Sequence, residues 1–191
     1  MKIEDYLAGN FTGKPCFGDR GKESDWLDLC EFALRSPSLH VVDPCYASDP
    51  REGCLVALPP GIYRVQARAI AYGRDVRISR LRATRSDAAA VTGPEIGYTG
   101  SDTANIGIYD FEVFSRAWGV KGKSSWETIR PTLEGADTHG VAVLDEAVGA
   151  VMPFVSSGFG DGTFPIHEFR VDGSRVGFEV TFVRADAGYP F

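Results

Sequence analysis

The sequence predicts a mainly β domain, either a β-sandwich or a barrel-like fold, with one N-terminal helix and one short internal helix. Three observations support this class. The 191 residues include 22 glycines and 11 prolines spread without a period, which indicates many short elements joined by turns. Apolar residues make up 43% of the chain, enough to close a single core. Several segments alternate apolar and polar side chains, as half-exposed strands do.

The N-terminal part contains the segment with helical spacing. Ser24 can cap a helix that runs from Ser24 or Asp25 to about Leu34, and a Ser-Pro step would end it. The apolar side chains that recur at helical intervals are Trp26, Leu29, Cys30, Ala33 and Leu34. We therefore predict an N-terminal helical extension, residues 1–37, packed on a β-rich domain, residues 38–191.

Short apolar runs separated by turn residues fill the chain from residue 38 onward. Residues 62–72 alternate small or apolar side chains with arginine and glutamine, the period of two of a half-exposed strand. The clearest hairpin joins residues 164–171 to residues 175–183 through an Asp-Gly-Ser turn. The remaining strands are predicted at residues 38–43, 54–58, 76–83, 104–109, 141–144 and 149–156.

Two connections lack any apolar period. Residues 84–103 contain alanine, threonine and glycine and are expected to form a loose connection. Residues 119–125 combine glycines, lysines and serines and are expected to form an exposed loop. Between them, residues 111–118 are predicted to form the short internal helix.

The N-terminal residues and the cysteines indicate the cellular compartment in which the protein is expected. Two acids follow Met1 closely, where a secretory signal needs a basic start and an apolar run, so a cytoplasmic protein is expected. The longest apolar stretch, residues 140–155, contains two acids and is shorter than the roughly 20 residues that span a bilayer, so no membrane role is expected. Reduced thiols without structural zinc are predicted for Cys16, Cys30, Cys45 and Cys54, which form no Cys-x-x-Cys pair.

The densest group of unusual residues is the block Ser-Gly-Phe-Gly-Asp-Gly-Thr-Phe-Pro-Ile-His at residues 157–167. Its glycines allow positive φ angles and present Asp161 on an open loop. Two interpretations stay open. In one, the block is a glycine-rich hairpin or bulge in which Asp161 caps backbone N–H groups. In the other, Asp161, Thr163, His167 and Asp43 line a ligand-binding site.

Other aspartates also lie at strand ends beside turn residues. If the sheet topology brought them together, the carboxylates of Asp43, Asp102, Asp110 and Asp161 would suit calcium or magnesium. Such a cation would activate water in a metal-assisted hydrolase, with His167 as the base. The alternative is that these are solvated turn residues.

A nucleophilic enzyme would need a base beside a thiol or a hydroxyl. The pairing to test is Cys45 with His40 or His167, although no nucleophile motif surrounds Cys45. Each histidine alone is more often a surface or hydrogen-bonded residue than a catalyst.

The segment at residues 61–90 is basic in an acidic chain. It has seven arginines and two aspartates, a local net charge of +5, whereas the whole chain has a net charge of −6. We interpret the arginines as a solvated sheet face paired with acids from neighbouring strands. Phosphate or an acidic partner is the alternative. Nucleic acid is not an expected partner, because the segment lacks interleaved exposed aromatic residues.

Four motifs occur in a recognisable order: Val42-Asp43-Pro44-Cys45-Tyr46, Pro59-Pro60-Gly61-Ile62-Tyr63, Asp102-Thr103-Ala104 with Ile108-Tyr109-Asp110, and the block from Ser156 to Ile166. Over residues 39–183 the chain resembles the domain of unknown function 4241 family of bacterial and phage-associated proteins. The resemblance implies a shared architecture and a shared site around Asp43, Asp110 and Asp161, and it implies no reaction. The family has Tyr or Trp near Pro165, so it assigns no role to His167.

Two functions follow from these observations, and whether the protein is an enzyme stays open. The first is a cytoplasmic binding or interaction domain, a toxin- or phage-associated partner protein whose glycine-rich edge is the contact surface. The negative net charge of the chain would suit a basic protein partner. The second is the metal-assisted hydrolase with a carboxylate cluster around Asp161.

Overall fold

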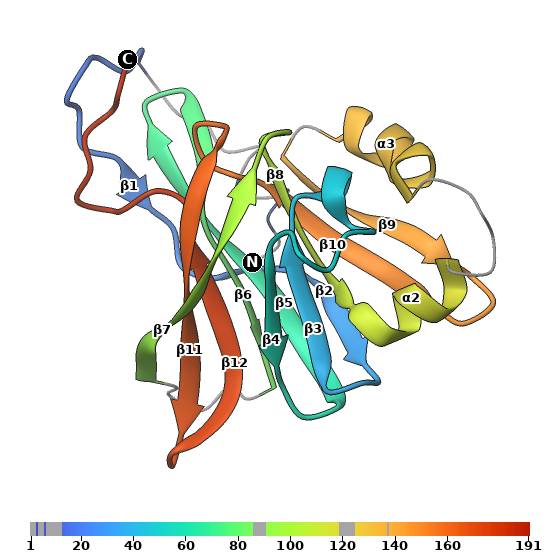
Figure 1. Ribbon diagram of the computed structural model, residues 1–191. Helices are drawn as coiled ribbons and strands as arrows, with labels where there is room; N and C mark the ends of the chain where they lie inside the picture. Colours follow the sequence, from blue (N-terminus) through green and yellow to red (C-terminus); the bar gives the residue numbers. More distant parts are fainter. Residues whose placement is uncertain (1–2, 4–5, 7–12, 86–90, 119–124, 137) are drawn as a thin grey trace.

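The computed structural model describes residues 3, 6, 13–85, 91–118, 125–136 and 138–191 (Figure 1). One antiparallel sheet consists of β1 (Lys22–Glu23), β2 (Leu27–Leu34), β5 (Gly61–Tyr72), β6 (Asp75–Thr84), β7 (Val91–Ser101), β11 (Gly162–Val171) and β12 (Ser174–Thr181). A second antiparallel sheet consists of β3 (Ser38–Val42), β4 (Cys54–Ala57), β8 (Asn105–Asp110), β9 (His139–Asp145) and β10 (Ala150–Ser156).

The two sheets are open and pack against each other, so the β-sandwich predicted from the sequence is confirmed (Figure 1). The seven-stranded sheet has the order β1-β5-β6-β12-β11-β7, with β2 also paired to β5. The five-stranded sheet has the order β4-β3-β8-β10-β9. The strands predicted from residue 38 onward are all present, with small shifts at their ends.

The main core lies between the sheets. Tyr63 and Val65 of β5 are fully buried in one cluster with Val41 of β3 and Ile108 of β8. Alternation along each strand directs these side chains to the inner face and leaves polar side chains on the other. On β5 this leaves Arg64 and its polar neighbours on the outer face of the seven-stranded sheet.

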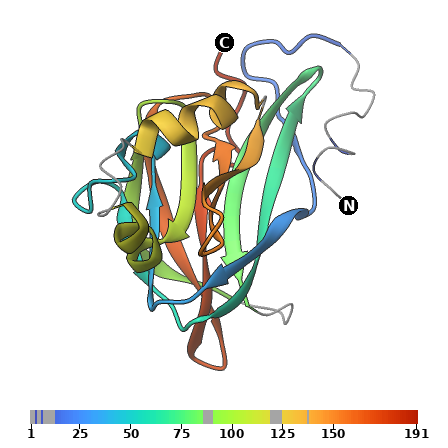
Figure 2. The same ribbon diagram turned by 90° about the vertical axis from the view of Figure 1, so that its right-hand side faces the viewer.

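Two helices cover the outer face of the five-stranded sheet, α2 (Phe111–Trp118) and α3 (Ser125–Glu134). Phe114 and Ile129 of these helices are buried in a second cluster with Tyr109 and Phe154 from the strands beneath. Figure 2 faces this side and shows both helices in front of the strands. The prediction of α2 is confirmed, whereas α3 was not predicted. None of the described helices is long and apolar enough to cross a membrane.

The helix predicted from Ser24 or Asp25 to Leu34 is wrong, because most of this segment is strand β2, paired with β5. A register shift between Asp28 and Cys30 interrupts the strand's alternation. The inserted residue brings apolar side chains to intervals that imitate a helix, and pairing with β5 outweighs local propensity. Residues 22–23 and 27–34 thus belong to the seven-stranded sheet rather than to a helical extension.

The connection expected at residues 84–103 contains the long strand β7, which pairs with β11. Its glycines and Pro94 hide the strand pattern, and β7 lies at the end of the strand order, where proline is tolerated. Residues 119–124 of the predicted loop lie outside the described residues, and Ser125 begins α3.

Candidate functional site

Three loops meet at one end of the sandwich, at the top of Figure 1. The first contains Asp43 and the short 3-10 helix η1 (Pro44–Tyr46), the second joins β7 to β8, and the third joins β10 to β11. The Thr103 N–H donates to Asp43 Oδ2 at 2.7 Å, and the Ser157 N–H donates to the Ala104 carbonyl at 2.9 Å. We call residues 43–47, 101–105 and 157–161 the Asp43 end.

Asp43 holds this end together. It follows the last residue of β3, caps η1 through the Cys45 N–H, and has no exposed surface. Its two oxygens accept hydrogen bonds from Cys45 N, Asp102 N, Thr103 N, Thr103 Oγ1 and Ser101 Oγ at 2.7 to 3.3 Å. A buried carboxylate is stable only when it is satisfied in this way. Asp43, predicted as a ligand-binding residue, therefore has a structural role here.

Ala104 adopts a backbone conformation that is unusual for an alanine. Its φ angle is +56°, in the left-handed region, where a Cβ atom is unfavourable. The loop is held in this shape because Thr103 is bonded to Asp43 and the Ala104 carbonyl accepts from Ser157. Backbone strain of this kind persists only where the surroundings enforce it.

The glycine-rich block is accounted for largely by packing. Gly158 has a φ of +66°, and a Cβ there would lie 2.6 Å from a methyl carbon of Val183. The Ser157 hydroxyl donates to the Gly160 carbonyl at 2.7 Å, which closes the turn. Phe159 packs against Tyr72 with a ring separation of 5.8 Å. The hairpin interpretation therefore explains the glycines.

Asp161 and Thr163 are exposed at the start of β11. Gly162 pairs with Ser101, so the backbone places Asp161 beside the end of β7 that leads into Asp102. Three of the four predicted metal ligands thus lie toward the same end of the sandwich.

Asp110 lies at the other end of β8, because Leu39 pairs with Asp110 whereas Val42 pairs with Gly107. Its oxygens accept from Arg35 N at 2.6 Å and Val113 N at 3.1 Å, and also from the backbone and hydroxyl of Ser36. This carboxylate joins the corner between β2 and β3 to the start of α2. The described residues contain no group of three or more histidines, cysteines or acids arranged to hold a metal. The four aspartates therefore do not form the cation site that was expected.

The two histidine candidates lie on different strands, His40 in β3 and His167 in β11. His167 lies within β11, opposite Glu179 on one side and Glu95 on the other. The His40 ring is fully buried, with Nε2 2.6 Å from the Glu52 carbonyl and Nδ1 2.5 Å from the Tyr109 hydroxyl.

Burial and the nearby aspartates raise the pKa of the Cys45 thiol, which disfavours the thiolate. Burial lowers the pKa of His40. Both ring nitrogens of His40 are occupied, so neither is available to Cys45 as a base.

A small hollow of about 110 Å³ opens on the surface of the Asp43 end. It is lined by Val42, Tyr46, Glu52, Gly53, Gly100 and Asp102. The Tyr46 hydroxyl donates to Asp102 Oδ2 at 2.7 Å, which raises the pKa of Tyr46 to about 12. Tyr46 is 37% exposed, and the side chains of Glu52 and Asp102 are open to solvent. Neither Tyr46 nor Glu52 was proposed from the sequence, although Tyr46 closes the motif that begins at Val42.

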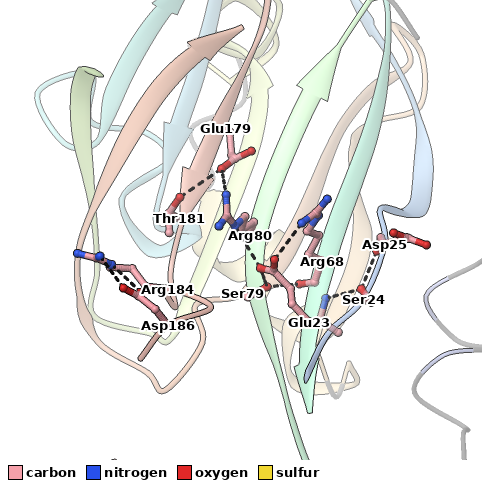
Figure 3. A network of polar contacts seen from close by, with 11 residues as sticks. Glu23, Ser24, Asp25, Arg68, Ser79, Arg80, Glu179, Thr181, Arg184 and Asp186 are labelled. Carbon is pink, nitrogen blue, oxygen red and sulfur yellow. Dashed lines mark hydrogen bonds and ion pairs between the residues drawn. The ribbon is translucent and has the colours of Figure 1, made fainter. Parts of the chain in front are cut away.

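The arginine-rich hairpin β5–β6 is paired with acids from neighbouring strands, as expected. Glu23 of β1 binds Arg68 at 2.9 Å and Arg80 at 3.1 Å, and Arg80 also binds Glu179 of β12 at 2.8 Å (Figure 3). The Ser79 hydroxyl donates to Glu23 at 2.8 Å in the same network (Figure 3). These contacts neutralise much of the positive charge of the outer sheet face.

Trp26 lies against the same arginines. The guanidinium carbon of Arg82 is 4.0 Å from the Trp26 ring centroid, and that of Arg68 is 4.9 Å away. Such cation–π contacts hold the arginine side chains against the sheet.

Comparisons with protein-family models, with curated proteins and with solved structures found no match for this chain. The resemblance drawn from the four motifs therefore stays a prediction.

Proposed function

We propose that this chain is a non-catalytic binding domain that uses the Asp43 end to contact a positively charged surface of a partner protein. The observation that carries the proposal is the hollow beside Tyr46, where Glu52 and Asp102 present carboxylates to solvent. A basic toxin or phage component is the partner class that the sequence resemblance suggests.

The chemistry of the hollow suits a lysine or arginine side chain. Asp102 and Glu52 supply acceptors for charge-assisted hydrogen bonds. Tyr46 supplies a half-exposed aromatic ring, a side chain that is enriched in protein interfaces and can contact a cation through its face. The net charge of −6 would speed the approach of a basic partner.

Hydrogen bonds hold the backbone beneath this surface. Asp43 is buried and fixes the backbone of Asp102 through an N–H bond of 2.8 Å. The exposed carboxylate of Asp102 is thereby oriented by its bond from Tyr46 before any partner arrives. Groups that are ordered in advance lose less entropy on binding.

Three of the other candidate residues make structural contacts. Asp43 and Asp110 accept backbone hydrogen bonds, and His40 is held between Glu52 and Tyr109. These contacts support a binding role over the metal-assisted hydrolase.

The test uses decalysine as a probe, titrated calorimetrically into the full chain at low salt. Substitution of Glu52→Gln with Asp102→Asn should weaken binding by about tenfold, because it removes the two carboxylates of the hollow. The matched control, Glu127→Gln with Glu146→Gln, removes two exposed charges elsewhere and should change affinity less than twofold. Equal weakening by both double variants would show attraction to net charge alone and would contradict the proposal.

A further inference from the structure

A second cleft lies away from the Asp43 end, where the corner between β2 and β3, helix α2 and the β9–β10 turn come together, at the lower right of Figure 1. Its volume is about 460 Å³, within the range of pockets that hold small organic ligands. The residues that line it are Arg35, Ser36, Pro37, Glu112, Val113, Arg116 and Val148. No residue of the sequence-predicted site contributes to it.

The charge in this cleft is opposite to that of the chain. Two arginines and one glutamate line it, whereas the chain as a whole has a net charge of −6. Arg35 forms no ion pair with a carboxylate among the described residues, and its Nη1 donates to the Val148 carbonyl at 2.6 Å. Arg116 contacts Glu112 at 3.3 Å, but its side chain is 82% exposed, so this pair contributes little.

Arg35 differs in this respect from the arginines of the β5–β6 hairpin. There, Arg68 and Arg80 are bound to carboxylates at about 3 Å. The Arg35 guanidinium is bonded to a neutral carbonyl, which leaves the rest of its fork without an ion pair to a carboxylate among the described residues. A fork of this geometry matches a carboxylate, which it can bind through two parallel hydrogen bonds.

Three of the other lining residues are apolar, beside the polar Ser36 and the charged Glu112. Pro37, Val113 and Val148 line the cleft, and Val148 is 40% exposed. These side chains offer contact to a hydrocarbon group. A ligand that satisfies both parts of the lining carries one negative charge and an apolar body.

The cleft is preformed. Asp110 accepts from the backbone of Arg35 and Ser36 on one wall and from the Val113 N–H on the other. This buried carboxylate holds the two walls together, and its charge is compensated by these donors and by the start of α2. Little reorganisation is needed for a ligand to enter.

We infer that this cleft binds a small monocarboxylate with an apolar body, with Arg35 holding the carboxylate, Arg116 adding positive charge, and Pro37, Val113 and Val148 contacting the hydrocarbon part. The inference does not depend on the proposed function, because the two sites share no residue.

The experiment titrates octanoate, below its micelle-forming concentration, into the full chain by calorimetry. The wild type should bind one octanoate per chain, and uncharged octanamide and short acetate should each bind at least about tenfold more weakly, because each lacks one of the two contacts. Arg35→Gln should weaken octanoate binding about tenfold or more, and Arg116→Gln severalfold. Arg51→Gln, a control at an exposed arginine outside the cleft, should leave the affinity unchanged.

Thermal unfolding of each variant shows whether the variant is still folded. The variant at the exposed Arg116 tests the cleft without removing the hydrogen bond from Arg35 to Val148. Equal affinity for octanoate and octanamide, equal affinity for acetate and octanoate, or no binding by the wild type would overturn the inference. Wild-type affinity in a folded Arg35→Gln variant would do the same. The Glu52→Gln, Asp102→Asn variant should bind octanoate as the wild type does, so that this inference and the proposed function of the Asp43 end are tested independently.

Discussion

Thr103 donates both its backbone N–H, at 2.7 Å, and its side-chain hydroxyl, at 2.8 Å, to the buried carboxylate of Asp43. This double contact ties the β7–β8 turn to the end of β3. Residues that are distant in sequence are thereby fixed beside each other, and the backbone of the exposed Asp102 is held by the same carboxylate.

Substitution of Asp43→Asn should destabilise the protein by about 2–4 kcal/mol, because the amide nitrogen cannot accept the hydrogen bonds that one carboxylate oxygen now receives. Urea unfolding measures the change. The exposed Asp161→Asn variant serves as a control and should lie within about 0.5 kcal/mol of the wild type. Equal stability of the Asp43 variant and the wild type would refute the structural role of this carboxylate.

Ala104→Gly should stabilise the chain by about 0.5–1 kcal/mol, because glycine adopts the φ of +56° without the steric penalty of a Cβ. The comparison variant is Ala57→Gly in the exposed part of β4, which should lose stability because its extended backbone does not need glycine. Thermal unfolding of both variants decides the matter. A destabilised Ala104 variant would show that the turn is not strained.

Much of the fold could be predicted from the sequence, because alternation of apolar side chains marks strands that face a core. A strand in which that alternation is broken does not show this pattern. The register shift near Cys30 made β2 resemble a helix, and Pro94 with its neighbouring glycines concealed β7 at the edge of the sheet. Both segments are strands because they pair with a strand that is distant in sequence, and the local sequence carries no information about that pairing.

The placement of the candidate aspartates was predicted in part. The motifs containing Asp43, Asp102 and Asp161 do lie toward one end, whereas Asp110 lies at the other end of β8. Sequence spacing cannot tell whether a carboxylate faces solvent or accepts backbone N–H groups. Asp43 was therefore expected to bind a ligand, and Glu52 was overlooked because only the folded chain brings it to the hollow.

The stability of the protein should fall as the pH drops below about 6.5, the ordinary pKa of histidine, because burial lowers the pKa of His40. Below that pH the unfolded chain takes up a proton that folded His40 resists, so acid favours unfolding. His40→Gln should reduce the slope of stability against pH between 7 and 5. An NMR titration of the wild type, in which His40 protonates at its ordinary pKa, would contradict this explanation.

Glu168 should contribute a second loss of stability at lower pH. Its side chain is 1% exposed, and hydrogen bonds from Arg170 and Arg175 lower the pKa of its carboxyl. The contribution is present above the ordinary glutamate pKa of about 4.3 and is lost as the pH falls toward the lower folded value. The stability difference between wild type and Glu168→Gln should therefore shrink from pH 6 to pH 3, as followed by thermal unfolding. A constant difference would rule out the linkage.

The most direct test of the proposed binding function is to map, by NMR, which backbone amides respond to decalysine in the full chain. We predict that the largest chemical-shift changes fall on Tyr46, Glu52 and Asp102, with smaller changes at Asp161, and that they vanish in the Glu52→Gln, Asp102→Asn variant. Changes centred instead on the outer sheet face, at Glu95 and His167, or spread evenly over the acidic surface, would contradict a binding site at the Asp43 end.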